Sequence, residues 1–311
     1  MKKFTKICLI IVAVMGGVGL VLCGIALVMG ADPGTLRRMA QGGELRRGNW
    51  HIGPYGVYYK GEPEPRGEID TGDRTEDSTY TYPVESIKNL ELDVEAATLL
   101  FREGADDANV AVHLYDGSET YFEGEMDGDT LSLSYDTNYY GLGYPNAEIV
   151  VGLPAGMSFE KIDMDIGAAE VEFALSDLIC ANLLLDVGAG NITAGKITVT
   201  GEMDVDIGAG NVVIADGICQ DIRLDCGVGR FTMQGVANGN VVARCGIGEL
   251  KLDLEGDVSA YNYQLSCGMG NLEVNGTSYS LLGGSREITN PGAAKTIELD
   301  CGMGSIEFDL S

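Results

Sequence analysis

The sequence is poor in histidine, proline and tryptophan, with 2, 8 and 1 of them among 311 residues. The two histidines, His51 and His113, are far apart in the chain, so they do not suggest a His-rich metal site, and we assign both a structural role. Few prolines beside 45 glycines exclude a collagen or a linker composition. Periodically spaced glycines instead indicate many tight corners.

Sequence motifs of the common catalytic sites are also absent. The chain has no Gly-x-Ser-x-Gly, His-Glu-x-x-His, Gly-Lys-Ser/Thr or Cys-x-x-Cys stretch. Its Gly-x-Gly copies are repeated in a β context, whereas a nucleotide-binding fingerprint occurs once, in a strand–turn–helix unit. The many carboxylates leave a glycosidase pair open, because β-helices can carry such sites, but no two carboxylates stand out. We therefore predict a protein that is not an enzyme and that uses no cofactor.

Basic residues are few, since 20 Lys and Arg stand against 47 Asp and Glu, for a formal net charge of -27. Residues 1–80 hold ten basic and nine acidic residues, so the excess of acid lies in residues 81–311. Such a domain repels nucleic acid and anionic headgroups and attracts cationic peptides or basic protein surfaces. The alternative is that the charge serves only solubility.

One uncharged run, residues 7–30, is long enough to span a bilayer. A cleaved signal peptide has a shorter apolar stretch and a small-residue exit, so we predict an uncleaved single-pass transmembrane helix. The basic N-terminus at residues 1–6 and the acidic domain after the helix favour an extracellular C-terminal domain at the cell membrane, although four arginines after the helix weaken this argument. Residues 31–84 show no sustained period and are predicted to be a linker or stalk.

A glycine-rich phrase recurs through residues 161–311. The copies are "MDIGAAEVEF" (164–173), "LDVGAGNITA" (185–194), "VDIGAGNVVI" (205–214), "LDCGVGRFTM" (224–233), "ARCGIGELKL" (243–252), "LSCGMGNLEV" (265–274) and "LDCGMGSIEF" (299–308). A period near twenty residues, sustained over so many copies, is typical of a repeat architecture.

Within each copy the apolar residues alternate, and their phase changes at Gly-x-Gly. Leu, Cys and Met share one parity before the change, and the following Leu and Val share the other. This pattern predicts two short strands joined at a corner, where we expect a backbone dihedral that a side chain would strain. The corner glycines are Gly188, Gly190, Gly208, Gly210, Gly227, Gly229, Gly246, Gly248, Gly268, Gly270, Gly302 and Gly304.

Stacked copies bury an interior that one copy alone cannot form. We therefore predict an all-β fold, a single-stranded parallel β-helix or β-roll solenoid with coils of about 20 residues, over residues 85–311. Irregular coils are expected at 85–160 and regular ones at 161–311, with a degenerate copy, "LDVEAATLLF", at 92–101. A separate β-sandwich over 85–155 is the alternative.

Four cysteines occupy one repeat position, Cys226, Cys245, Cys267 and Cys301, where earlier copies have Val187 and Ile207. A position that accepts Val, Ile or Cys faces the interior, so we predict a ladder of buried thiols. A disulfide between neighbouring coils is the main alternative. Metal binding is disfavoured, because a column of parallel side chains does not form a tetrahedron.

An aspartate precedes that position in most copies, namely Asp165, Asp186, Asp206, Asp225 and Asp300. These side chains are expected to point outward and, when stacked, to repel one another. They are either solvated or bonded to nearby backbone, with a calcium stripe as the alternative. The motif differs from that of known calcium β-rolls.

The stretch "EIVVGLPAG" (148–156), followed by "IDMDIGAAEVEF" and serial Asp-x-Gly-x-Gly coils, resembles the bacterial "putative adhesin" family of unknown function. The resemblance covers about residues 85–311. It implies an envelope protein with a β-helix and an N-terminal membrane segment, and no catalytic residues. Some relatives accompany envelope-stress systems.

Two functions follow from these features. The first is a non-enzymatic, membrane-anchored binding module, adhesin-like or related to envelope stress, whose partners would be surface glycans, cationic peptides or other envelope proteins. Tyr139, Tyr140 and Tyr144, in the loop "YDTNYYGLGYP" (135–145), form its candidate contact patch, since grouped tyrosines suit such contacts. The alternative is a self-assembling homo-oligomeric scaffold that stacks through an open last coil, unless residues 275–298 fold over that end.

Overall fold

The computed structural model describes residues 76–104, 106–115, 121–136, 147–279 and 284–311, and the backbone of three short strands between residues 45 and 59. Within these ranges no helix is long and apolar enough to cross a bilayer. The transmembrane helix that we predicted at residues 7–30 lies outside the described residues.

The chain divides into two compact units, Met1–Gly72 and Asp73–Ser311. In the first unit, three strands form an antiparallel sheet inside the segment that we expected to be a linker: β1 (Leu45–Arg47), β2 (Trp50–Gly53) and β3 (Gly56–Tyr59). In the second unit, the sheet already includes β4 (Glu76–Pro83), which precedes the boundary expected at residue 85.

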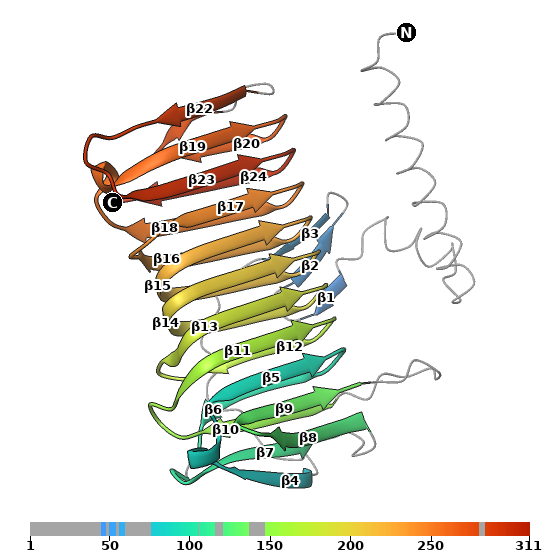
Figure 1. Cartoon of the computed structure of the whole chain (residues 1–311). Helices are drawn as coiled ribbons and strands as arrows, with labels where there is room; N and C mark the ends of the chain where they lie inside the picture. The colour runs from blue at the N-terminus through green and yellow to red at the C-terminus, as the bar shows by residue number, and fades with distance from the viewer. Residues whose placement is uncertain are drawn as a thin grey trace, which may run out of the picture. The chain divides into compact units, whose positions relative to one another are not determined.

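The second unit is a stack of β-coils (Figure 1). Its strands form one continuous 21-stranded sheet that winds around a central core. The helical segments among the described residues are two single 3-10 turns, η1 (Val84–Ser86) and η3 (Val258–Ala260). The all-β coil stack that the repeat predicted is therefore confirmed.

Each regular coil has two walls that meet at the Gly-x-Gly corner. In spatial order the first wall contains β8 (Phe122–Asp127), β9 (Thr130–Tyr135), β5 (Asn89–Val94), β11 (Ser158–Ile166), β13 (Leu178–Val187), the ends of β14 (Asn191–Ile207) and β15 (Asn211–Cys226), β17 (Val241–Cys245), β23 (Lys295–Cys301), β19 (Tyr261–Cys267) and β22 (Gly284–Ile288). The second wall contains β4, β7 (Asn109–Tyr115), β10 (Glu148–Leu153), β6 (Thr98–Glu103), β12 (Glu170–Ala174), the starts of β14 and β15, β16 (Arg230–Ala237), β18 (Glu249–Glu255), β24 (Ser305–Leu310), β20 (Asn271–Val274) and β21 (Thr277–Ser278).

Equivalent residues of neighbouring coils pair in parallel and in register. Ile166 lies opposite Val187 on the first wall, and Phe173 lies opposite Ala194 on the second. The degenerate copy at 92–101 joins the same stack, because β5 pairs with β11 and β6 pairs with β12. A separate β-sandwich over residues 85–155, our alternative, is therefore wrong.

The coils do not stack in the order of the sequence. Near the N-terminal end, β5 and β6 lie between the β9–β10 coil and the β11–β12 coil. At the other end, β23 lies between β17 and β19, and β24 lies between β18 and β20. The last copy in the chain is therefore an internal coil, and the expectation that it forms an open end is wrong.

Antiparallel strands cover both ends of the stack. At the C-terminal end, β22 pairs with β19 and β21 pairs with β20, both from the segment 275–298. At the N-terminal end, β8 pairs with β9, while β7 and β4 extend the second wall. The prediction that residues 275–298 fold over the last coil is confirmed.

The core is a set of inward-facing columns. Burial alternates along the strands, so that β9 and β7 bury every second residue. One column runs through Tyr135, Val94, Ile166, Val187, Ile207, Cys226, Cys245, Cys301 and Cys267, all at most 4% exposed. Fully burying one Val or Ile side chain contributes about 1.5–3 kcal/mol, so the stack gains stability with each coil.

The corner glycines are needed for a reason other than the one we expected. The positive-φ glycines of the described chain are Gly128, Gly156, Gly235, Gly276 and Gly292, and none of them is a Gly-x-Gly corner residue. Instead, the corners themselves are hydrogen bonded from coil to coil, as when Ala189 N donates to Gly167 O at 2.7 Å. A Cβ on Gly208 would lie 2.9 Å from Gly188 O, and one on Gly304 would lie 2.7 Å from Cys245 Sγ. Close approach, not a left-handed dihedral, requires glycine here.

Candidate binding surface

Aspartates form an outward column along the first wall, which we call the aspartate column. In spatial order its positions hold Asp93, Asp165, Asp186, Asp206, Asp225, Arg244, Asp300 and Ser266. The pKa of Asp186 is raised by burial and by its neighbours Asp165 and Asp206. Within the described part of the chain, no ion pair involves these three aspartates. They therefore form a strip of uncompensated negative charge.

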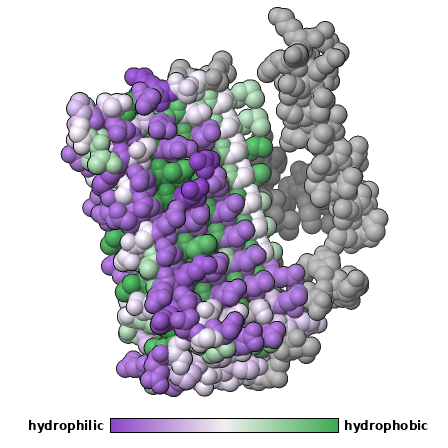
Figure 2. Space-filling model, viewed as in Figure 1, coloured by the Kyte–Doolittle hydropathy of each residue, from purple (hydrophilic) through white to green (hydrophobic). Residues whose placement is uncertain are grey.

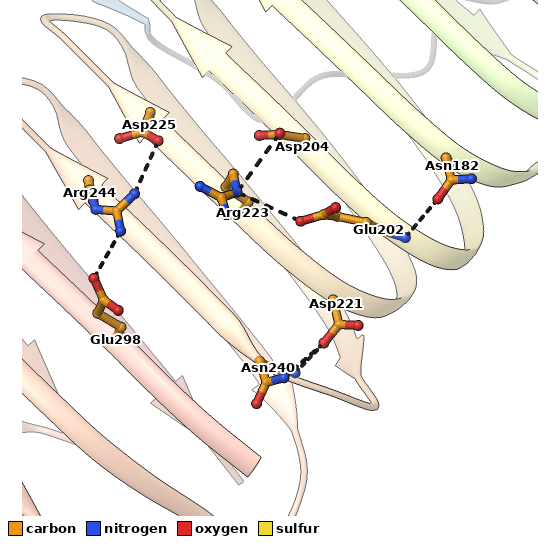
Figure 3. A network of polar contacts seen from close by, with 9 residues as sticks. All are labelled: Asn182, Glu202, Asp204, Asp221, Arg223, Asp225, Asn240, Arg244 and Glu298. Carbon is orange, nitrogen blue, oxygen red and sulfur yellow. Dashed lines mark hydrogen bonds and ion pairs between the residues drawn. The ribbon is translucent and has the colours of Figure 1, made fainter.

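Further along the stack, basic residues bridge acidic ones on neighbouring coils (Figure 3). Arg244 stands in the aspartate column and contacts Asp225 at 3.6 Å and Glu298 at 2.9 Å. Arg223 approaches Glu202 at 3.7 Å and Asp204 at 3.9 Å from the neighbouring column. Arg244 therefore relieves the repulsion at the one place where the column would otherwise join Asp225 to Asp300.

Cross-strand pairs on the second wall follow the same rule. Arg230 contacts Glu249 at 2.7 Å, and Lys251 contacts Glu307 at 2.6 Å, each with the residue directly opposite on the next coil. These basic side chains are used within the wall. The excess negative charge is consequently concentrated on the first wall around Asp165, Asp186 and Asp206.

An apolar line runs along the edge where the two walls meet, formed by the middle residue of each Gly-x-Gly corner. We call it the edge stripe, and in spatial order it contains Ala168, Ala189, Ala209, Val228, Ile247, Met303 and Met269. The last four side chains are 62%, 49%, 51% and 67% exposed. Figure 2 shows hydrophobic colouring along this long edge beside a mostly hydrophilic face.

Sequence reasoning missed the edge stripe although its signal is visible in the repeat. The middle position reads Ala in three copies and then Val, Ile, Met and Met. We grouped Met with Leu and Cys because they share one parity. The alternation ends at the first glycine, however, so Met269 and Met303 turn outward while Cys267 and Cys301 face the core.

The four ladder cysteines are buried and unpaired by disulfides. Their order through the core is Cys226, Cys245, Cys301 and Cys267. Cys301 Sγ donates to Gly304 O at 3.2 Å, and burial raises the pKa of this thiol to about 12. The pKa of Cys245 is also raised, by its hydrogen bond with Cys226 and by burial. Neutral, inward-facing thiols of this kind act as small apolar side chains.

Cys180 and Cys219 lie on a different side of the coils. Val199 lies between them, opposite Cys180 in one coil and opposite Cys219 in the next. Both are free and buried, and burial raises the pKa of each thiol to about 12. One intervening coil keeps them too far apart for a direct disulfide.

The predicted tyrosine patch and metal alternatives have different outcomes. Tyr139, Tyr140 and Tyr144 lie outside the described residues, so the contact patch stays a prediction. In the described ranges, no group of three or more His, Cys, Asp or Glu side chains is arranged to hold a metal ion. His113 has a structural setting, with Nδ1 3.1 Å from Thr79 Oγ1 and its ring stacked on Tyr115.

The family model named Toastrack DUF4097 matches residues 87–283, more than half of the chain. The chain belongs to the Toastrack DUF4097 family. The resemblance to the bacterial "putative adhesin" family is thereby confirmed. No curated protein matches this Toastrack chain significantly.

Solved structures similar to this Toastrack chain share little of its sequence. A "putative cell adhesion protein" from Clostridium sporogenes is 14% identical, covers 76% of this chain and 100% of its own, and has a TM-score of 0.35. A "putative adhesin" from Bacteroides fragilis is 15% identical over 75% of this chain and 96% of its own, with a TM-score of 0.41. A "putative lipid binding protein" from Parabacteroides distasonis is 11% identical over 76% and 97%, with a TM-score of 0.30.

Proposed function

We propose that the protein is a non-enzymatic binding module of the cell envelope, adhesin-like or related to envelope stress. Residues 7–30 would tether it to the membrane and the coil stack would face outward. The proposal joins the uncharged N-terminal run to an acidic, repetitive domain of the Toastrack family. Its partners would be surface glycans, cationic peptides or other envelope proteins.

One observation carries the proposal: side chains of one kind repeat in register on the outside of the stack. Asp165, Asp186 and Asp206 lie opposite one another on successive coils, about 4.8 Å apart. Their backbones are fixed by parallel pairing on both sides. A surface that is rigid before its ligand arrives loses little conformational entropy on binding.

The test is protease treatment of intact cells that express the full chain, followed by detection of a C-terminal tag. The proposal expects the coil stack to be removed from intact cells, while a cytoplasmic marker protein survives. If the stack survives on intact cells and is cut only after lysis, it lies inside the cell and the proposal fails.

End-to-end stacking into a scaffold, our alternative, loses its physical basis. It required the last copy to be an open edge, whereas that copy is internal and the terminal coil is paired with β21 and β22. The outermost strand of the first wall, β22, is short and carries Arg286 and Glu287, features that discourage edge pairing.

A further inference from the structure

The edge stripe is the surface feature that folding does not explain. The exposed large apolar side chains of the described chain are Val228, Ile247, Val258, Met269 and Met303. All except Val258 belong to the edge stripe and occupy four successive coils. Glycines flank each of them, so no neighbouring side chain in the corner covers them. Continuous exposed apolar surface marks a site of interaction.

The corner itself does not require large apolar residues. Ala168, Ala189 and Ala209 occupy the same position in the first three regular coils and make the same backbone hydrogen bonds to the preceding coil. Val228 and Met269 therefore add apolar area that faces solvent and contributes nothing to the core. A binding partner gives this area a use, and methionine side chains adapt well to varied partners.

The charge beside the stripe selects the kind of partner. Each of Asp165, Asp186 and Asp206 precedes a stripe alanine by three residues, so the uncompensated part of the aspartate column runs alongside the stripe. Basic side chains placed here would relieve the repulsion between the carboxylates. A second copy would bring two acidic columns together, and an anionic bilayer would be repelled.

We infer that the edge stripe and the adjoining aspartate column bind an amphipathic polypeptide segment whose apolar face is flanked by lysine or arginine. The inference rests on the proposed binding function and names its ligand class. A helix fits the spacing, because one turn rises about 5.4 Å and neighbouring coils are about 4.8 Å apart. Its apolar residues would contact Val228, Ile247, Met303 and Met269, while its basic residues would reach Asp165, Asp186 and Asp206.

The test uses a fluorescent peptide of about 18 residues, roughly 27 Å long as a helix, with leucines on one face and lysines beside them. Anisotropy measures its binding to the purified full chain. The combined change Val228→Ser, Ile247→Ser, Met303→Ser and Met269→Ser should weaken binding at least about tenfold. Asp165→Asn, Asp186→Asn and Asp206→Asn together should weaken it about three- to tenfold and flatten its salt dependence. Val258→Ser, the matched control outside the stripe, should change affinity by less than about twofold.

Three results would overturn the inference. One is equal binding by the stripe variant, which is expected to fold because its changes are exposed; unaltered circular dichroism and melting temperature confirm folding. The second is equal binding of a scrambled peptide with the same composition. The third is stripe-dependent binding of phosphatidylcholine vesicles without peptide binding, which would make lipid the ligand. Any of these with surface removal intact leaves the proposed function standing, whereas protection on intact cells refutes that function without altering peptide binding.

Discussion

At the second glycine of each corner, an added methyl group would meet the preceding coil. For Gly304 it would lie 2.7 Å from Cys245 Sγ and 2.8 Å from the carbonyl carbon of Ile247, and it would also meet Gly248 O. The sequence correctly placed glycine at a corner between strands. It could not give the reason, because the clash involves a coil that lies more than fifty residues earlier in the chain.

Gly304→Ala should lower the free energy of unfolding by about 1–3 kcal/mol or more, since the corner cannot move away from paired backbone. Gly195→Ala is the matched control, because its nearest atom would be Leu175 O at 4.0 Å. We expect the control to stay within about 0.5 kcal/mol of the parent in urea unfolding. Equal effects of the two changes would refute the close-approach explanation.

Asp186→Asn should raise stability at pH 7 by about 0.2–1 kcal/mol, the range of an exposed cross-strand pair. The folded state holds the Asp186 proton more tightly than the unfolded chain does, because burial and Asp165 and Asp206 raise its pKa. Stability is therefore lost as the pH rises from the usual Asp range through the raised pKa, and the variant avoids that loss. Below about pH 3 the carboxyl is protonated in both states and the gain should vanish. A gain that is the same at both pH values would contradict this account.

The buried thiols should resist alkylation. Burial raises the pKa of Cys180 and Cys301 to about 12, so neither forms a reactive thiolate near pH 8. Iodoacetamide followed by peptide mapping should leave both unmodified in the folded protein and modify both after denaturation. Rapid labelling of Cys301 in the folded state would show that the ladder is open to solvent.

Among the elements, the alternating phrase "LSCGMGNLEV" was enough to predict β19, the corner and β20. The copy at 299–308 predicted β23 and β24 equally well. What the phrase could not predict is which copy is outermost. Cys267 and Cys301 fill the same interior position, so either coil packs well on the β17–β18 coil, and the choice depends on the path of residues 275–298.

The strand β22 should keep the terminal coil from associating. Arg286→Pro with Glu287→Pro removes two backbone donors and should detach β22 from β19. Light scattering should then show a molar mass that rises with concentration, because the edge of β19 becomes available. Arg286→Ala with Glu287→Ala keeps the donors and should behave like the parent. A proline variant that also behaves like the parent would show that β22 does not protect the edge.

On the scale of the whole molecule, charge and apolarity are arranged along the axis of the stack. Ion pairs such as Arg244–Glu298 and Arg230–Glu249 join neighbouring coils, while Asp165, Asp186 and Asp206 stay unpaired within the described chain. The net charge of -27 was evident from composition, but its distribution was not, because it depends on which residues become neighbours across coils. The edge stripe likewise becomes continuous only after the coils are stacked.

Everything proposed for the outer surface depends on the order of the coils, so that order is the measurement to make. Ile247→Cys with Met303→Cys places two exposed thiols on adjacent coils, about 4.8 Å apart at Cα, within the range of a disulfide. Ile247→Cys with Met269→Cys places them two coils apart, about 9.6 Å, beyond that range. After mild oxidation and peptide mapping, we predict a disulfide in the first variant and none in the second. The reverse result would mean that the coils stack in sequence order, which would contradict both the edge stripe and the aspartate column as described.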